Sequence, residues 1–144
     1  MKSVLVLNGP NLDRLDLRSK SVYGDFDYEQ LTKLVTQYAA EAGFQAEIRQ
    51  SNDEAELINW LHEAADKALP VVFNPAAFTH YSYAIRDAVE MLRAPVIEVH
   101  ISNPLAREEF RHTSVVSGVV NGTIAGFGLN SYRLALLALR DLVK

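Results

Sequence analysis

Short apolar runs alternate with segments of helical period along this chain, and that alternation restricts its fold more than any other feature. The runs of strand length are Ser3–Leu7, Gln45–Arg49, Val71–Phe73, Val96–Val99 and a part of Val115–Phe127. The segments of helical period are Tyr28–Ala42, Glu54–Ala68, the stretch from Thr79 to Leu92, and Tyr132–Val143. Strands that are joined through helices pair in parallel, so this order predicts a parallel sheet covered on both faces.

The fold class follows from this order. We predict an α/β, flavodoxin-like three-layer fold with a central parallel sheet, in a single domain spanning 1–144. Asp27 can cap the helix that begins at Tyr28, since Gln30 follows three positions later, and Gly43 can end that helix. Thr79 is the expected cap of the third helix.

Composition excludes several classes of protein. The net charge of −4 is opposite to the basic excess that nucleic-acid binding requires, so no nucleic-acid partner is expected. The chain has no cysteine, which excludes disulfides, thiolate metal sites and cysteine nucleophiles. The run Val4–Leu7 is too short for a signal peptide, and no stretch approaches the roughly 18 apolar residues of a membrane span. We therefore predict a cytoplasmic protein without a membrane partner.

The residues that follow the strands are the candidates for a site, because open parallel sheets bind ligands beyond the carboxyl ends of their strands. The first strand leads into Asn8–Leu12 and then a polar connection from Asp13 to Asp27, which is long enough to be a functional lid. The polar side chains expected to converge at this edge are Asn11, Arg18, Tyr23, Asn74, His80, Glu98, His100, Ser102 and Arg111.

Glu98 is the most informative of these residues. Its neighbours Ile97 and Val99 predict a buried strand, where an unpaired carboxylate is costly. Glu98 and His100 are two positions apart, so in a strand they point to the same side. A carboxylate that orients the histidine and favours its imidazolium form would explain a buried glutamate. The alternative is an edge strand with a solvated Glu98.

A series of motifs, in order along nearly the whole chain, resembles those of the type II 3-dehydroquinate dehydratases, or type II dehydroquinases. The motifs are Val6–Leu12, Val22–Gly24, Gln50–Asn52, Asn74-Pro75 with Thr79-His80, Ile97–Asn103, Ala106–His112 and Ile124–Gly128. Each motif is weak alone, whereas the ordered set is specific. The resemblance implies a cofactor-free hydro-lyase that eliminates water from 3-dehydroquinate, through an enolate, to give 3-dehydroshikimate.

The resemblance also implies catalytic roles. Tyr23 would be the base that removes a proton alpha to the substrate ketone, and Arg18 would stabilise the tyrosinate and the developing enolate. His100, held by Glu98, would be the acid that protonates the departing hydroxyl. Asn11 would position a water molecule that hydrogen-bonds the enolate oxygen.

A second set of residues would bind the substrate. By the same resemblance, Asn74 with Ile101 and Ser102 would bind the substrate carboxylate, and His80 and Arg111 would bind ring hydroxyls.

The resemblance bears on assembly and pathway as well. Asp87 matches a position that reaches the site of a neighbouring subunit, which implies trimers assembled into dodecamers. The resemblance implies that no cofactor takes part. No metal is expected, because the histidines lack a close metal-ligand spacing. The same reaction serves aromatic amino acid biosynthesis by the shikimate pathway and quinate metabolism, and the sequence leaves both open.

A tyrosine acts as a base only when ionised. Free tyrosine titrates near pH 10, so ionisation at neutral pH requires a shift of about 3 units, and one nearby cation supplies about 1–3. We therefore hypothesise that Arg107 adds to Arg18, or that only a minor fraction of Tyr23 is ionised. Imine chemistry is not expected, since each lysine lies in polar surroundings or at a terminus.

The lid departs from the family pattern. Asp13 and Asp16 replace the usual asparagine or glycine residues, and Ser19-Lys20 stands for a Glu-Pro pair. We expect these changes to affect substrate affinity and lid closure more than chemistry, and a shifted substrate preference stays open. One alternative is a paralogue that binds a quinate-like ligand without turning it over. Another is a flavin-binding or nucleotide-binding protein, but the chain lacks the complete phosphate loop that such a protein needs.

Overall fold

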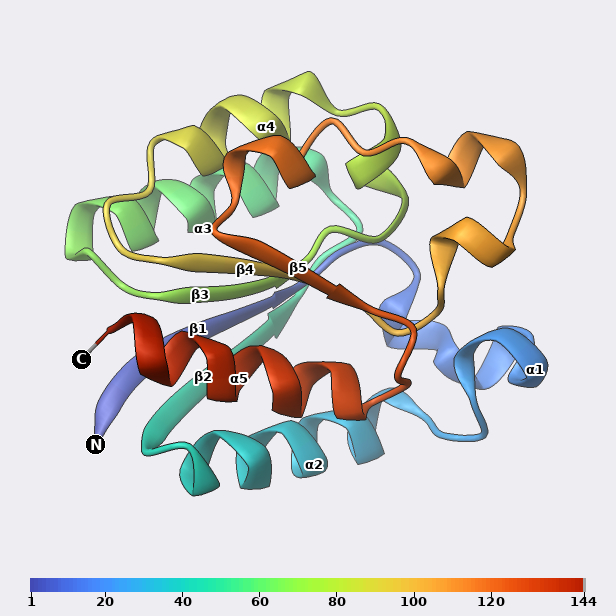
Figure 1. Cartoon of the computed structure of the whole chain (residues 1–144), viewed down its shortest axis with the longest axis horizontal. Helices are drawn as coiled ribbons and strands as arrows, with labels where there is room; N and C mark the ends of the chain where they lie inside the picture. Colours follow the sequence, from blue (N-terminus) through green and yellow to red (C-terminus); the bar gives the residue numbers. More distant parts are fainter. Residues whose placement is uncertain (144) are drawn as a thin grey trace.

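A sheet of five parallel strands forms the middle layer of the computed structural model, which describes residues 1–143 (Figure 1). The strands are β1 (Lys2–Asn8), β2 (Phe44–Gln50), β3 (Val71–Asn74), β4 (Val96–His100) and β5 (Gly122–Ala125). Their order across the sheet is β2-β1-β3-β4-β5, and all neighbouring pairs are parallel. The predicted flavodoxin-like fold is confirmed.

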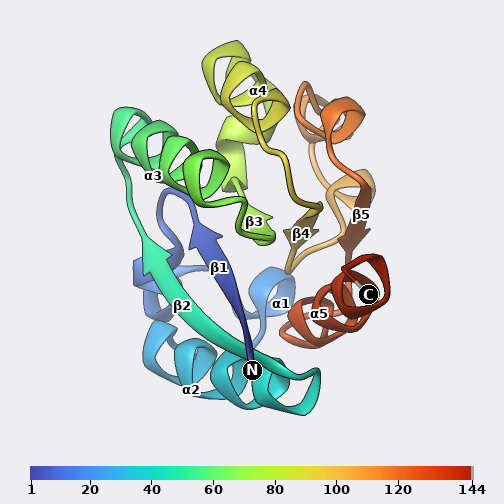
Figure 2. The same ribbon diagram turned by 90° about the vertical axis from the view of Figure 1, so that its left-hand side faces the viewer.

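Helices cover both faces of the sheet. The helices α2 (Tyr28–Glu41) and α5 (Asn130–Leu142) lie on one face, and α3 (Glu54–Lys67) and α4 (Tyr83–Glu90) lie on the other (Figure 2). Alternate residues of β1 enter different cores: Val4 and Val6 pack towards α2 and α5, whereas Leu5 and Leu7 pack towards α3 and α4. Because both faces of β1 are buried in this way, its sequence is a continuous apolar run.

Short helical segments follow the strands at their carboxyl ends, on the right-hand side of Figure 1. The segment η1 (Leu12–Leu17) and α1 (Lys20–Tyr23) form the predicted lid after β1. The segment η2 (Ala76–His80) follows β3, and η3 (Pro104–Ala106) and η4 (Glu109–His112) follow β4. The short η5 (Ser117–Val119) precedes β5.

Gly9 brings the ends of β1 and β3 together. Its backbone N–H donates to the carbonyl of Asn74 over 2.7 Å. A Cβ on this residue would lie 2.6 Å from the carbonyl oxygen of Pro75, which is closer than side chains tolerate. The loops that carry Asn11 and Asn74 are therefore held at a spacing that only glycine permits.

Two local predictions have opposite outcomes. The capping box of α2 is present, with Asp27 accepting from the Gln30 N–H and the Gln30 side chain accepting from the Asp27 N–H. The prediction that Thr79 caps α4 is wrong, because Ser82 is the N-cap and accepts from the Ile85 N–H. Within residues 1–143, no helix is long and apolar enough to cross a lipid bilayer.

Candidate active site

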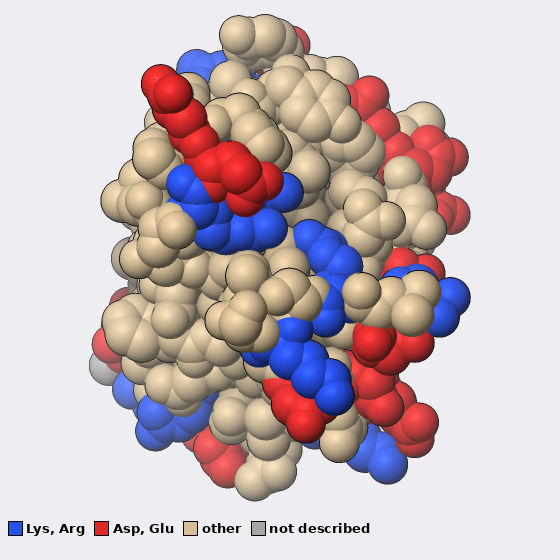
Figure 3. Space-filling model, turned by 90° about the vertical axis from the view of Figure 1, so that its right-hand side faces the viewer, with Lys and Arg blue, Asp and Glu red and all other residues tan. Residues whose placement is uncertain are grey.

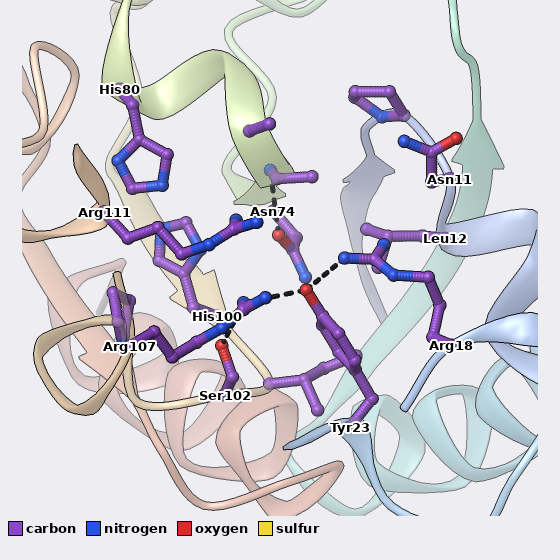
Figure 4. A pocket seen from close by; sticks show the side chains of 15 residues that line it. Asn11, Leu12, Arg18, Tyr23, Asn74, His80, His100, Ser102, Arg107 and Arg111 are labelled. Carbon is purple, nitrogen blue, oxygen red and sulfur yellow. Dashed lines mark hydrogen bonds between the residues drawn. The ribbon is translucent and has the colours of Figure 1, made fainter. Parts of the chain in front are cut away.

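A pocket opens at the carboxyl edge of the sheet, between the lid and the segments that follow β3 and β4 (Figure 4). The predicted site residues that line it are Asn11, Arg18, Tyr23, Asn74, His80, His100, Ile101, Ser102 and Arg111. Lys and Arg side chains gather near the middle of this face of the molecule, and Asp and Glu lie mostly towards its margins (Figure 3). The surroundings of the pocket therefore favour an anionic ligand.

The hydroxyl of Tyr23 lies between two guanidinium groups. Nη2 of Arg18 donates to this oxygen, and Nη1 of Arg107 donates to it over 2.8 Å (Figure 4). The two guanidinium carbons also lie 4.0 and 5.0 Å from the centre of the tyrosine ring. The Tyr23 oxygen is therefore held by two charged donors and faces the pocket.

His100 and Glu98 form a buried pair behind the pocket wall. Nε2 of His100 lies 2.6 Å from Oε2 of Glu98, whose side chain is 0% exposed. A carboxylate only accepts hydrogen bonds, so Nε2 carries a proton and Nδ1 is the ring nitrogen left for a ligand. β4 lies between β3 and β5, so the alternative of an edge strand with a solvated Glu98 is wrong.

Hydroxyl groups complete the surroundings of Glu98. Thr79 Oγ1 donates to Oε2 over 2.6 Å, and Ser117 Oγ donates to Oε1. Ser114 in turn lies 2.6 Å from the Thr79 hydroxyl and accepts two backbone N–H groups. Burial alone would raise the pKa of Glu98, but the hydrogen bonds from His100, Ser117 and Thr79 outweigh it and lower that pKa below its ordinary value. The carboxylate therefore stays ionised next to His100.

His80 is set up as a hydrogen-bond acceptor for a ligand. Its Nδ1 lies 2.8 Å from the carbonyl oxygen of Thr113, which only accepts, so Nδ1 carries the proton. Burial lowers the pKa of His80, against a smaller opposing effect of this hydrogen bond. The neutral ring that results has Nε2 free to accept from a hydroxyl group.

Three predicted binding residues already have partners within the chain. Asn74 donates from Nδ2 to the hydroxyl of Tyr132 over 2.9 Å. Ser102 accepts from Nη1 of Arg107 over 3.1 Å. Arg111 donates from Nε to both carboxylate oxygens of Glu108, at 3.2 and 3.3 Å. Each of these side chains is therefore oriented before any ligand is bound.

Asp87 lies apart from the pocket. It is exposed on α4 and does not line the pocket of its own chain.

Asn11 has a left-handed backbone (φ 70°), and its N–H donates to Oδ1 of Asn52 over 2.9 Å. Among residues 1–143, no cluster of three or more His, Asp and Glu side chains is arranged to hold a metal ion.

Comparison with known proteins identifies the family. A family model described as "Dehydroquinase class II" matches residues 2–140. The chain is 57% identical over 133 residues to the 3-dehydroquinate dehydratase of Salinispora tropica, covering 92% of this chain and 93% of that one. The crystal structure of the type II dehydroquinase from Propionibacterium acnes matches with a TM-score of 0.95 and 52% identity, covering 98% and 97% of the two chains. The chain belongs to the class II dehydroquinase family.

The type II dehydroquinase of Butyrivibrio crossotus is also similar, with a TM-score of 0.92 and 45% identity over 96% of this chain and 97% of that one. The predicted family is confirmed, and it is a family of enzymes. The readings as a ligand-binding paralogue and as a flavin protein are not favoured by any of these similarities.

The two aspartates of the lid add no negative charge to the lining of the pocket. Asp16 forms an exposed ion pair with Arg14 at 3.0 Å, and Asp13 accepts a hydrogen bond from Gln50. Neither aspartate lines the pocket. The lid nevertheless carries Arg18 and Tyr23 inwards, because Leu12 and Leu15 bury the inner side of η1 in the core.

Several residues that support this site were not predicted from the sequence to be part of it. They are the hydroxyl groups of Thr79, Ser114 and Ser117 around Glu98, and the side chains of Asn8 and Tyr132 behind Asn74. A signal was available for one of them: a buried carboxylate requires donors beyond a single histidine. The sequence alone does not say which hydroxyls supply them.

Proposed function

We propose that this protein is a 3-dehydroquinate dehydratase that eliminates water from 3-dehydroquinate through an enolate, giving 3-dehydroshikimate. The observation that carries the proposal is the position of the Tyr23 hydroxyl between Arg18 and Arg107, in the same pocket as His100. Elimination of water from a β-hydroxy ketone needs a base, a group that stabilises the enolate, and an acid. This pocket offers one side chain of each kind.

In the proposed first step, the tyrosinate form of Tyr23 removes a proton alpha to the ketone. The electron pair of that C–H bond forms the enolate, whose oxygen Asn11 stabilises through a bound water molecule. Arg18 and Arg107 both donate to the Tyr23 oxygen, so two cations lie in contact with the charge that moves during the transfer.

In the second step, the enolate collapses and the hydroxyl beta to the ketone departs. His100 gives this hydroxyl a proton from Nδ1, so that it leaves as water. Glu98 holds the opposite nitrogen and stabilises the imidazolium form that the step requires. The hydrogen bonds that lower the pKa of Glu98 keep its charge available for this purpose.

The remaining pocket residues fit a polyhydroxylated carboxylate. We propose that Asn74, Ile101 and Ser102 bind the substrate carboxylate, and that His80 and Arg111 bind ring hydroxyls. Nε2 of a neutral His80 is suited to accept a hydroxyl proton, because Nδ1 is committed to the Thr113 carbonyl.

Wider proposals concern the whole chain, its location, its assembly and its pathway. Residues 1–144 act as a single catalytic domain, located in the cytoplasm. The chain forms trimers that assemble into dodecamers, with Asp87 reaching the site of a neighbouring subunit; its exposure on α4, away from its own pocket, supports this assignment. The reaction serves the shikimate pathway or quinate breakdown.

The test is to mix the purified protein with 3-dehydroquinate and follow the ultraviolet absorbance of the conjugated product. We expect turnover by the wild type and its loss in Tyr23→Phe, which keeps the ring and removes the base. Tyr38→Phe, on the half-buried α2 residue outside the pocket, is the matched control and should retain activity. Binding without turnover in the wild type would instead indicate a protein that holds the ligand. Full activity in Tyr23→Phe would refute the choice of base.

A further inference from the structure

Asn74 is connected through a buried chain of side chains to helix α5 and to strand β1. Its Nδ2 donates to the hydroxyl of Tyr132 on α5 over 2.9 Å, and that hydroxyl lies 2.6 Å from Oδ1 of Asn8 on β1. Asn8 and Tyr132 are both 0% exposed, and Tyr132 does not line the pocket. The contacts join β3, α5 and β1 just behind the pocket wall.

The direction of each hydrogen bond in this chain is fixed. Nδ2 of Asn8 donates to the backbone carbonyl of Arg49 on β2 over 3.3 Å, so Oδ1 of Asn8 must be the atom that faces Tyr132. An amide oxygen only accepts, so the hydroxyl of Tyr132 donates its single proton to Asn8. The Tyr132 oxygen is then left as an acceptor for Asn74.

The orientation of the Asn74 amide follows. Oδ1 of Asn74 accepts the backbone N–H of Ala76 over 3.1 Å, and one Nδ2 proton goes to Tyr132 (Figure 4 shows the first of these bonds). The side chain lines the pocket, so one N–H is left for a ligand there. With Oδ1 directed to the Ala76 N–H, the group that this amide offers to the pocket is an Nδ2 donor, which suits a carboxylate or carbonyl oxygen.

We infer that Tyr132 is a positioning residue: together with Asn8, it fixes the Asn74 amide as a hydrogen-bond donor to an anionic oxygen of the ligand. The inference rests on the proposed function, in which that oxygen belongs to the substrate carboxylate. The preference of the pocket for an anionic oxygen at Asn74 would then depend on a residue of α5 that the ligand does not contact.

The state of Tyr132 agrees with this assignment. Complete burial raises the pKa of its hydroxyl well above the ordinary value, and the hydrogen bond from Asn74 opposes this only in part. Tyr132 therefore keeps its proton and remains a donor to Asn8 wherever the protein is folded. An ionised Tyr132 would instead accept from both neighbours and turn the Asn8 amide around.

Tyr132→Phe tests the inference, because it keeps the buried ring and removes the hydroxyl. We expect KM for 3-dehydroquinate to rise about tenfold, with a much smaller change in kcat, since the carboxylate lies away from the bonds that break. Tyr38→Phe is the matched control on the same core and should leave both constants unchanged. An unchanged KM in Tyr132→Phe would overturn the inference.

A double-mutant cycle separates positioning from a general loss of stability. If Tyr132 acts through Asn74, then Tyr132→Phe should change KM by less than about twofold in an Asn74→Ala background. An equal loss in both backgrounds would mean that Tyr132 supports the fold and does not act through Asn74.

A second measurement needs no catalysis and no Tyr132 variant. In the wild type, the Nδ2 proton of Asn74 that is bonded to Tyr132, assigned by its loss in Asn74→Ala, should exchange with solvent far more slowly than the side-chain amide protons of exposed Asn59. Equal exchange rates would refute the buried hydrogen bond to Tyr132. If the wild type did not turn over 3-dehydroquinate, the proposed function would fail, whereas this exchange rate would still test the hydrogen bond between Asn74 and Tyr132.

Discussion

The carboxylate of Glu98 accepts a hydrogen bond from the imidazole of His100 over 2.6 Å, and both side chains belong to the interior strand β4. The two residues are adjacent on one side of the strand, so the backbone itself sets their spacing. Thr79 and Ser117 occupy other acceptor positions of the carboxylate. The pair is thus a fixed unit whose charge is retained although it is buried.

Replacing Glu98 by glutamine should impair catalysis while preserving the fold. Glutamine has the same shape but no charge, so it can hold the His100 ring and cannot stabilise its imidazolium form. We expect kcat to fall by about 10²-fold, within the range that general acid catalysis contributes. Steady-state kinetics of Glu98→Gln measure this, and Glu56→Gln on the exposed side of α3 is the control. A wild-type kcat in Glu98→Gln would exclude an electrostatic role for this carboxylate.

The same residue predicts how stability depends on pH. Burial acts to raise the pKa of Glu98, yet its hydrogen bonds leave the folded value below the ordinary 4.5. A lowered folded pKa gives stability that is complete above the unfolded-state value and is lost as pH falls through the folded value. Urea unfolding between pH 3 and pH 6 should therefore show the wild type losing its advantage over Glu98→Gln as pH falls. A constant difference between the two proteins would contradict the prediction.

The two arginines around Tyr23 should each contribute to the rate. We expect Arg18→Met and Arg107→Met to lower kcat by about 10- to 100-fold each, because each removes one cation from the tyrosinate. Steady-state kinetics of the two variants measure the loss, and an unchanged kcat in either variant would exclude its arginine from the reaction.

A matched control for the arginine variants lies on the same lid. Arg14 is exposed and paired with Asp16, and neither lines the pocket. Arg14→Met and Asp16→Ala should change KM by less than about twofold, because exposed ion pairs contribute little. An increase in KM comparable to that of the Arg18 variant would show that the lid surface matters to binding.

Sequence patterns were sufficient for the fold and for the lining of the pocket, because both depend on local periodicity and on the order of strands. They did not predict which of several possible partners a polar side chain contacts. Thr79 lies in η2, ahead of α4, and donates to Glu98 on the neighbouring strand, whereas Ser82 immediately precedes α4 and caps it. The contact of Tyr132 with Asn8 spans 124 positions, a separation at which no local pattern operates.

Gly9→Ala tests whether the spacing of the two loops controls the site. The added methyl group would lie 2.6 Å from the Pro75 carbonyl oxygen and 3.2 Å from that of Asn74, so the loops must separate or the strand end must shift. We expect a destabilisation of about 1–3 kcal/mol, typical of overpacking, together with a rise in KM, because Asn11 and Asn74 lie on the displaced segments.

Thermal unfolding and steady-state kinetics of Gly9→Ala measure the two effects together. Gly118→Ala is the steric control, since the nearest atom to its new methyl group is the end of the Arg86 side chain at 3.8 Å. A Gly9→Ala protein that was less stable but had an unchanged KM would show that the strain at Gly9 does not reach the pocket. A raised KM in both glycine variants would mean that the site responds to general loss of stability, and that the close approach at Gly9 has no specific part in it.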